Sequence, residues 1–427
     1  MLTLLIISDD FTGALDTGVQ FAARGAITSV ITYPDFDFSS IDKELQVLVI
    51  DAETRHLKPE SAYSVVRQIV EKALKNGVFC IYKKTDSALR GNVGAELTGV
   101  LDAAGADRLP FVPAFPKTGR VTLNGIHFIK GIPVAESVFG QDLFEPVRHS
   151  RVADILKEQS LVATVERRPG ELGKDLPGIQ IFDASTDDDL LQIGWQLGIN
   201  GIRLCAGCAG FAAIIAELLA LTGSLPQKPV LQRPFFVVCG STNPVTRCQL
   251  DAAERAGFPR FRLSPEQKIL TQWLEGNECK TTVKKWIQAA SQKGCCILDS
   301  NDLSGSDTRI FAAEQGMNIQ RVRERISNTL GQLMKKLLDN GLEATLMCTG
   351  GDTLLALMKA VGVGELTPVC ELSTGVVLTK FNYQGKIYNI ISKSGGFGDP
   401  ELLCKLEEQT VALKADREEG ICLRNTI

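Results

Sequence analysis

Apolar runs alternate with amphipathic segments through the first half of the chain. The apolar runs predict strands at residues 2–8, 27–33, 45–51, 78–83 and 109–112. The segments between them predict helices at residues 12–24, 59–76 and 92–104. This alternation is typical of βαβ units in a mostly parallel sheet. Strands such as 45–51 are almost continuously apolar, which favours a sheet that helices cover on both faces.

A proline-rich stretch interrupts the alternation at residues 225–234, after a predicted helix at 210–221. Proline resists both helix interiors and central strands, so this stretch is predicted to be a linker. A new set of elements follows it: strands 235–239, 295–299 and 344–348, helices 244–256, 280–293, 318–340 and 353–361, and a hairpin at 374–392. We therefore predict two α/β domains, at 1–224 and 235–410, each a mostly parallel sheet flanked by helices.

Composition excludes several classes of function. The chain has 427 residues, too many for one hydrophobic core, and a net charge of −4 that gives no electrostatic footprint for nucleic acid. Its three histidines are far apart in sequence, which argues against a histidine-based zinc site. The apolar run at 2–7 is short and ends in Asp9-Asp10, so it predicts a strand rather than a signal peptide or membrane span. We expect a cytoplasmic protein without a membrane partner.

The twelve cysteines lie mostly inside apolar runs, as buried and reduced cysteines do in large proteins that are not exported. Cys205 and Cys208 have the spacing of a redox pair, but no second pair completes a zinc site. We interpret both as structural.

Charged residues gather at the predicted carboxyl ends of three strands in the first domain. Asp9 and Asp10 follow the first strand, and Arg55 follows the third. The fourth strand ends in the stretch from Lys84 to Ser87, and Arg90 comes shortly after it. In open α/β sheets ligands bind at these ends. Arginine can hold a carboxylate through two hydrogen bonds, and aspartate can accept hydrogen bonds from hydroxyl groups. An aspartate before a helix is often only an N-cap, so the convergence of three strand ends carries the prediction of a site for a small hydroxylated acid.

Three glycine-rich loops follow predicted strands in the second domain, although neither a Walker A motif nor a GxGxxG fingerprint is present. Such loops, placed before helices, can direct backbone N–H groups at phosphate. Tight turns are the alternative explanation for each loop alone, but three together favour a nucleotide site. The candidate residues are Ser241, Gly350, Gly351, Asp352, Thr353, Gly395 and Gly396.

Together these motifs resemble the four-carbon acid sugar kinase family over nearly the whole chain. The most specific parts are Asp9 to Ala14, Lys84 to Ser87 with Leu89 to Asn92, Gly119-Arg120 to Asn124-Gly125, Gly350 to Thr353, and Lys393 to Gly398. One departure is Cys208, where the family commonly has serine, which puts a polar role of that turn in doubt.

The resemblance implies a sugar-acid-binding first domain and a second domain that binds ATP, with Mg²⁺ as the usual partner of the phosphates. It implies phosphorylation of the terminal hydroxyl of D-threonate, D-erythronate or a 3-oxo-tetronate, and the stretch 16–20 favours the first two. Substrate contacts would fall on Asp9, Asp10, Arg55, Lys84, Thr85, Asp86, Ser87 and Arg90.

Asp10 or Asp86 is the candidate catalytic base, while Lys84 and Arg90 would offset negative charge. The metal ligands and the oligomeric state stay open, with a homodimer as one option.

Three rival functions follow from the same residues. The first is a dinucleotide-dependent dehydrogenase, but this chain lacks the GxGxxG fingerprint that such an enzyme would need. The second is a sugar-acid sensor that binds ATP without turnover, and such a sensor would not need the acidic strand ends. A family kinase with another four-carbon acid as substrate is the main competitor to D-threonate.

Overall fold

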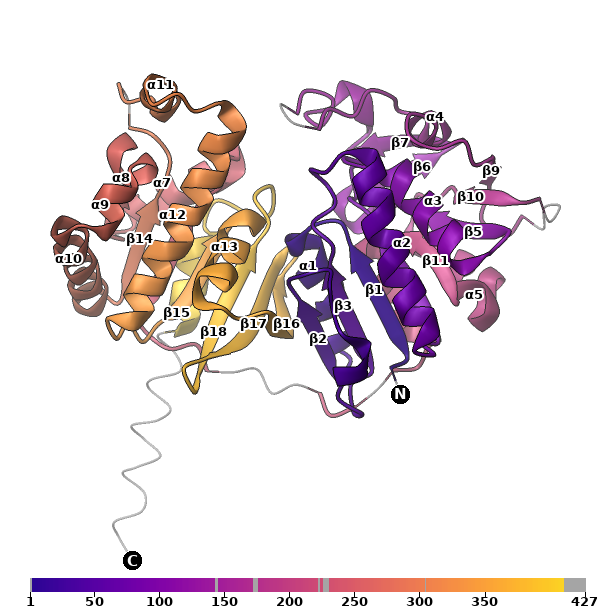
Figure 1. The fold of residues 1–427 in the computed structure, drawn as a ribbon, viewed down its shortest axis with the longest axis horizontal. Coiled ribbons are helices and arrows are strands. Elements are labelled where there is room, and N and C mark those ends of the chain that lie inside the picture. The colour runs from indigo at the N-terminus through magenta and orange to yellow at the C-terminus, as the bar shows by residue number, and fades with distance from the viewer. Residues whose placement is uncertain are drawn as a thin grey trace, which may run out of the picture. The chain divides into compact units, whose positions relative to one another are not determined.

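A computed structural model gives the fold, and it divides the chain into two compact units, Met1–Pro226 and Gln227–Ile427. The structure describes residues 2–142, 145–171, 176–221, 223–225, 230–303 and 305–410. Both units are α/β structures with a largely parallel sheet and flanking helices, as the sequence predicts (Figure 1).

The sheet of the first unit is parallel throughout its described strands, which run in the order β2-β3-β1-β4-β11-β5-β10-β9. The bounds of these strands are β1 Leu4–Ser8, β2 Thr28–Ile31, β3 Val47–Asp51, β4 Cys80–Lys84, β5 Arg108–Val112, β9 Thr164–Arg167, β10 Gly178–Phe182 and β11 Leu204–Gly207. The helices are α1 Phe11–Ala22, α2 Pro59–Lys75, α3 Val93–Ala104, α4 Val152–Lys157, α5 Asp187–Ile202 and α6 Ala209–Leu218.

Both faces of this sheet are covered, which explains why its strands are apolar at nearly every position. Alternate strand residues such as Leu5 and Ile7 join one core with Val66 of α2 and Leu97 of α3. Helix α1 packs on β1, β2 and β3 and also contacts α6, so it covers the opposite face. In the central strands β1, β3 and β4, side chains on both faces of the sheet are therefore buried.

A small antiparallel sheet, which the sequence pattern did not predict, completes the first unit. It consists of β6 (Arg120–Leu123), β7 (Ile126–Ile129) and β8 (Ile132–Pro133). Its turn at Asn124-Gly125 has positive φ at both residues, as a tight hairpin requires. Buried His127 of β7 is in contact with Thr122 Oγ1 through Nδ1 at 3.0 Å and with the Ser87 carbonyl through Nε2 at 2.9 Å.

The second unit has a mixed sheet in the order β13-β14-β12-β15-β18-β17-β16, in which the first five strands are parallel and the last two are antiparallel. The strands are β12 Phe235–Cys239, β13 Arg260–Arg262, β14 Cys295–Asp299, β15 Thr345–Thr349, β16 Glu365–Ser373, β17 Val376–Tyr383 and β18 Lys386–Lys393. The helices are α7 Pro244–Arg255, α8 Pro265–Ile269, α9 Thr271–Glu275, α10 Asn277–Lys293, α11 Thr308–Glu314, α12 Ile319–Asp339 and α13 Gly351–Val361.

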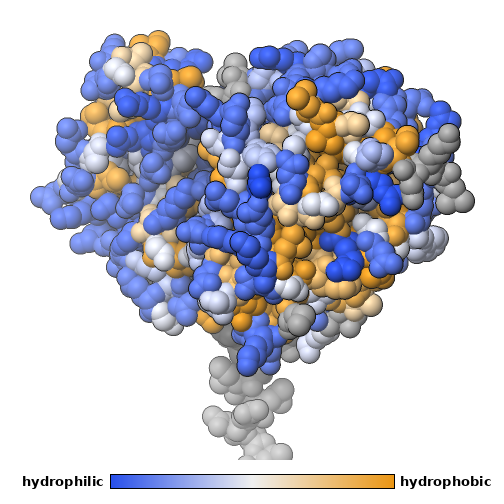
Figure 2. All heavy atoms as spheres, turned by 45° about the vertical axis from the view of Figure 1, so that its right-hand side comes forward, coloured by the Kyte–Doolittle hydropathy of each residue, from blue (hydrophilic) through white to orange (hydrophobic). Residues whose placement is uncertain are grey.

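The surface of the molecule is a mixture of hydrophilic and hydrophobic residues on the face that Figure 2 shows. Among the described residues, no helix is both long and apolar enough to cross a membrane.

The contact between α12 and α13 depends on one glycine. A Cβ on Gly331 of α12 would lie 2.5 Å from the carbonyl carbon of Ala356 on α13. The two helices can approach this closely because glycine has no Cβ that would separate the backbone of α12 from that of α13.

We expect Gly331→Ala to push α12 and α13 apart and to lower the free energy of unfolding by about 1–3 kcal/mol, the usual cost of overpacking a core. Chemical denaturation of the variant measures this change. Gln332→Ala, on the exposed side of the same helix, is the control and should change stability little. Equal stability of Gly331→Ala and wild type would contradict the close packing.

Candidate active site

The strand order of the first unit brings the three charged strand ends together. β1 lies between β3 and β4, and the register aligns Ser8 with both Asp51 and Lys84. The residues that follow these positions therefore emerge side by side at one edge of the sheet. This is the convergence that the sequence predicted.

Arg55 is the centre of the resulting charged network. Its Nε donates to Asp9 Oδ2 at 2.8 Å and its Nη1 donates to Asp10 Oδ2 at 2.8 Å. Its Nη2 lies 2.6 Å from Asp9 Oδ2 and 3.4 Å from Asp86 Oδ1. One buried guanidinium thus contacts three carboxylates, two from the end of β1 and one from the end of β4.

Asp86 is held by more donors than the other two carboxylates. Arg90 donates to it from Nε at 2.9 Å, from Nη2 at 3.1 Å and from its backbone N–H at 3.2 Å. The backbone N–H of Ala88 adds a hydrogen bond at 3.2 Å. The Nη1 of Arg90 also reaches Asp142 at 3.4 Å. The loop after β4 is therefore closed around the Asp86 carboxylate.

Asp10 has two roles in this geometry. Its Oδ1 accepts from the backbone N–H of Gly13 at 3.0 Å, which makes it the N-cap of α1, while Oδ2 faces Arg55. Its side chain is 25% exposed, compared with 3% for Asp9 and 10% for Asp86. Asp10 is thus both a helix cap and the most accessible of the three carboxylates.

The adjacent lysines Lys83 and Lys84 point to opposite faces of the sheet because strand side chains alternate. Lys84 lies 3.7 Å from Asp9 Oδ1, and a Cβ on Gly13 would lie 2.5 Å from its ammonium nitrogen. Lys83 is fully buried on the other face, where it pairs with Glu96 of α3 at 2.9 Å. Only a glycine at position 13 leaves room for the Lys84 ammonium beside α1.

The network shifts the proton affinities of its members. Burial raises the pKa of Asp9, but Arg55 and Lys84 outweigh it, so this pKa lies below its ordinary value. Burial also raises the pKa of Asp86, and here Arg90 and Arg55 prevail and hold the pKa well below the usual range. Burial would lower the pKa of Lys84, yet Asp9 and Asp10 keep it raised. These groups are therefore ionised at neutral pH.

The remaining predicted residues of this site also lie in the loop after β4. The backbone N–H of Thr85 donates to the Gly207 carbonyl at 2.8 Å, and its buried Oγ1 has no hydrogen-bond partner within the part of the chain that the structure describes. Ser87 is fixed through its carbonyl by His127. Burial lowers the pKa of His127 to about 4, so this imidazole is neutral and donates to Ser87 from one nitrogen.

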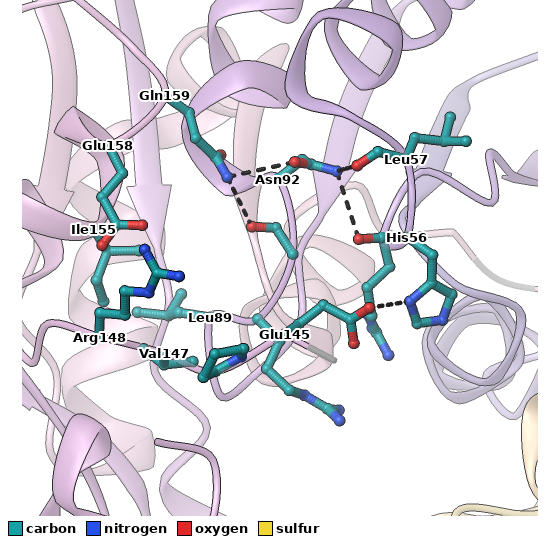
Figure 3. A pocket seen from close by; sticks show the side chains of 14 residues that line it. His56, Leu57, Leu89, Asn92, Glu145, Val147, Arg148, Ile155, Glu158 and Gln159 are labelled. Atoms are coloured by element: carbon teal, nitrogen blue, oxygen red, sulfur yellow. Dashed lines mark hydrogen bonds and ion pairs between the residues drawn. The ribbon is translucent and has the colours of Figure 1, made fainter. Parts of the chain in front are cut away.

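A cavity of about 290 Å³ opens beside the network within the first unit (Figure 3). Arg55 and Arg90 line it together with polar residues from the segment after the small sheet. His56 Nδ1 contacts Glu145 Oε1 across one wall, and Asn92 donates to the Leu57 carbonyl at 2.8 Å on another. The cavity therefore has a polar lining that includes the buried Arg55 and the half-buried Arg90.

In the second unit, the strand order brings the three glycine loops together. β12, β15 and β18 are neighbours, and Gly240, Gly350 and Ser394 follow them directly. The N–H of Gly240 donates to the Thr349 carbonyl, and the N–H of Gly350 donates to the Lys393 carbonyl, both at 3.1 Å. The loops after β12 and β15 are thus each hydrogen-bonded to the end of the strand beside them.

Ser241 lies where these loops meet. A Cβ on Gly395 would lie 2.7 Å from Ser241 Oγ, and a Cβ on Gly240 would collide with Thr353 Oγ1. Gly351 and Asp352 begin α13, and Asp352 pairs with Arg323 at 2.8 Å. The seven predicted nucleotide-site residues therefore lie in three adjoining loops and in the first turn of α13, and glycine is required where the loops pack closest.

Sequence reasoning missed several residues that support these sites. Asp142 and His127 fix the loop after β4, and Lys393 and Asn301 contact the loops of the second unit. Cys208, the departure from the family pattern, still makes a polar contact, because its buried Sγ donates to the Ala114 carbonyl at 3.0 Å. Cys205 and Cys208 are both free thiols. The unusual presence of a lysine at the end of the apolar strand β18 was a usable signal for Lys393.

The two units match two known domain types. Residues 4–215 match the sugar-binding N-terminal domain model, and residues 236–403 match the nucleotide-binding C-terminal domain model. These matches define a two-domain protein with one site for a sugar compound and another for a nucleotide.

Relatives of known activity cover nearly the same length. D-threonate kinase of Salmonella typhimurium is 29% identical over 94% of this chain and 97% of its own. D-erythronate kinase of Heliobacterium modesticaldum is 27% identical, over 95% and 96% of the two chains. 3-Oxo-tetronate kinase of Pseudomonas fluorescens is 24% identical, over 93% and 95%. The chain belongs to the four-carbon acid sugar kinase family and is a sugar-acid kinase.

Two solved structures share the fold. A Salmonella typhimurium LT2 protein described as a proposed tRNA synthase has a TM-score of 0.78 and 20% identity, over 95% of this chain and 99% of its own. A Haemophilus influenzae protein has a TM-score of 0.71 and 20% identity, over 96% and 99%. At this identity the similarity concerns the fold alone.

We expect Arg55→Lys to destabilise the first unit, because an ammonium cannot contact three carboxylates in the geometry of a planar guanidinium. The loss should be about 1.5–3 kcal/mol, the usual contribution of a hydrogen bond to a charged group. Denaturation at pH 7 measures it. The exposed pair of Arg67 and Glu71 supplies a control, Arg67→Lys, which should be nearly neutral. Unchanged stability of Arg55→Lys would mean that the network does not hold the strand ends.

Proposed function

We propose that this kinase transfers the terminal phosphoryl group of ATP to the terminal hydroxyl of a four-carbon sugar acid, with D-threonate as the first candidate. The observation that carries the proposal is the network of Asp9, Asp10, Arg55, Lys84 and Asp86 at the carboxyl edge of a sugar-binding domain. D-threonate stands first because the Asp16 to Gln20 stretch resembles the threonate and erythronate branch, and two relatives at 29% identity are D-threonate kinases. D-erythronate and 3-oxo-tetronates are the alternative substrates.

The sugar acid would occupy the cavity beside the network. Arg55 and Arg90 line that cavity while they hold the carboxylates, so the same cations can face the carboxylate of the substrate. The unpartnered Oγ1 of Thr85, together with Ser87 and Asp9, would accept or donate hydrogen bonds to the hydroxyl groups.

Asp10 is the better candidate for the catalytic base. A general base needs a free lone pair within reach of the substrate and enough proton affinity to accept a proton. Asp86 meets neither condition well, because Arg90 and two backbone N–H groups occupy its oxygens and its pKa is strongly lowered. Asp10 is more exposed and has fewer donors. Asp86 would then orient Arg55 and Arg90.

ATP would bind the glycine loops of the second unit through Ser241, Gly350 to Thr353, Gly395 and Gly396. Backbone N–H groups and the N-terminus of α13 favour phosphate there. Among the described residues, no group of three or more His, Cys, Asp and Glu could hold a metal ion. Mg²⁺ would therefore be held chiefly by phosphate oxygens, with Asp352 as a carboxylate that these loops offer, and it would neutralise phosphate charge.

A substrate screen tests the proposed function. ADP release would be measured by a coupled assay with D-threonate, D-erythronate, L-threonate and 3-oxo-tetronates, each with ATP and Mg²⁺. The highest kcat/KM with D-threonate is the expected result. A higher value for another four-carbon acid would reassign the substrate, and binding of ATP and acid without ADP release with any of them would favour the sensor.

We expect Asp10→Asn to lower kcat by on the order of 10²- to 10⁴-fold, the usual share of general-base catalysis. Asparagine can still cap α1, so the melting temperature should change little. Steady-state kinetics and a melting curve give both quantities. Asp37→Asn is the matched control, because Asp37 also caps a helix through its side chain but lies in a separate loop.

Near-normal turnover of Asp10→Asn would remove the catalytic assignment. Asp86→Asn would then be the next variant, with loss of kcat as the sign that Asp86 is the base.

A further inference from the structure

Lys393 is a buried cation directly beneath one of the glycine loops. It is the last residue of β18, its exposed fraction is 0%, and the glycine loop from Ser394 to Gly398 follows it. Its Nζ donates to Thr246 Oγ1 at 3.0 Å and to the carbonyls of Ser394 and Gly395, both at 3.1 Å. These three acceptors use all three hydrogens of the ammonium group.

These contacts determine which way the loop peptides face. The Gly395 carbonyl accepts from Lys393 and also from Thr246 Oγ1 at 2.8 Å, so it is fixed toward the interior. In a planar trans peptide, the carbonyl and the N–H that follows it point in opposite directions. The N–H groups of Gly395 and Gly396 are therefore turned away from the ammonium.

The two N–H groups are available to a ligand. Within the described part of the unit, neither the Gly395 nor the Gly396 N–H donates to a protein acceptor, whereas the neighbouring N–H of Ser394 donates to the Gly375 carbonyl at 3.0 Å. Gly396 is exposed, and the nearest side-chain atom to a Cβ built on it is Asn243 Nδ2 at 3.7 Å. Two adjacent free N–H groups above a buried cation form a site for an anion.

In the described residues of this unit, the contacts of the ammonium include no carboxylate. Burial lowers the pKa of Lys393 to about 8, with the Cys239 thiol of β12 as the titratable group that counteracts it. Burial raises the pKa of Cys239 to about 12, so this thiol is uncharged at neutral pH. The other neighbours, Thr349 on β15, Val376 on β17 and Thr246 on α7, do not titrate.

We propose that Lys393 is a positioning residue of the nucleotide site, which turns the Ser394 and Gly395 carbonyls inward, presents the Gly395 and Gly396 N–H groups to a phosphate of ATP, and supplies positive charge behind them. This inference rests on the proposed ATP site. It assigns no direct contact between Lys393 and the nucleotide, because the three hydrogens of the ammonium are already used.

The inference gives a pH dependence with a definite sign. A bound phosphate favours the protonated lysine, and by linkage the protonated lysine favours bound phosphate. ATP affinity is therefore highest below the pKa of Lys393 and falls as the pH rises through it. In the wild type we expect a loss on the order of 5- to 10-fold between pH 7.5 and pH 9.5, within the usual range of coupling between two sites.

The test measures ATP affinity by isothermal titration calorimetry at both pH values in wild type, Lys393→Met and Lys393→Gln. Methionine removes the charge and all three hydrogen bonds, so ATP should bind 10- to 100-fold more weakly at pH 7.5, with no remaining pH dependence. This range corresponds to losing about 1.5–3 kcal/mol of hydrogen bonding to a charged group. Glutamine keeps two donors without the charge, so it should restore part of the affinity but not the pH dependence. D-threonate affinity should stay at the wild-type value in both variants.

The control is Lys268→Met, which removes another buried lysine of the same unit, one that pairs with Asp302 instead of a glycine loop. It should lower the melting temperature without the selective loss of ATP affinity. Wild-type ATP affinity in Lys393→Met, or a pH dependence that survives in it, would overturn the inference.

If neither lysine variant folded, a flat wild-type profile across pH 7.5–9.5 would also overturn the inference, and a falling profile would support it. A wild-type protein that bound no ATP at all would instead refute the proposed nucleotide site.

Discussion

The first unit depends on the contact between one guanidinium and three carboxylates. Asp9, Asp10 and Asp86 emerge from neighbouring strand ends, and without a cation between them their charges would repel one another. Arg55 lies among them with 9% of its side chain exposed, so the attraction acts with little screening by water. Breaking such a buried set is costly because every group left behind is an uncompensated charge. Arg55 therefore links the loops after β1, β3 and β4 to one another.

The candidate site of the second unit would also bind an anion, but it is built from different groups. It contains few charged side chains and relies on backbone N–H groups in loops that pack closely enough to require glycine. Polar side chains hold these loops from behind: Asn301 donates to the Ser241 carbonyl at 3.2 Å, and Gln249 donates to the carbonyls of Phe397 and Asp399. Backbone N–H groups are sufficient to bind phosphates, because the phosphate groups are the same in every nucleotide. Charged side chains suit a small acid, which must be recognised by its carboxylate and hydroxyls.

The sequence predicted the elements with strong periodicity and missed those without it. The apolar strand at 45–51 and the amphipathic helix at 59–76 are confirmed as β3 and α2. Between residues 120 and 210 the signals were weak. Edge strand β9 is mostly polar and part-exposed, and α5 is interrupted at Gly198, whose φ of 58° breaks the helical pattern.

The sequence predicted which residues gather at each candidate site, but it did not predict which of them contact one another. Parallel strands end at one edge, so the gathering of Asp9, Arg55 and Asp86 followed from their positions after strands. The partners did not follow, because hydrogen-bond geometry depends on strand order and loop closure. Nothing in the sequence distinguishes Asp10, which stays accessible, from Asp86, which Arg90 encloses. Lys393 lies in a stretch that the sequence analysis singled out, but its burial and its contacts with the loop carbonyls were not predicted.

The cavity beside the network has walls of two different origins. Arg55, Arg90 and Asn92 come from loops anchored to the sheet, whereas Glu145, Arg148, Glu158 and Gln159 belong to the segment that leads into and out of the short helix α4. Gln159 donates to the Gly91 carbonyl at 3.1 Å, so hydrogen bonds attach the outer wall to the loop after β4. With the proposed sugar acid in this cavity, substitutions on the outer wall would be the ones that change the preferred stereoisomer, while the charged strand ends stay constrained by their contacts with Arg55.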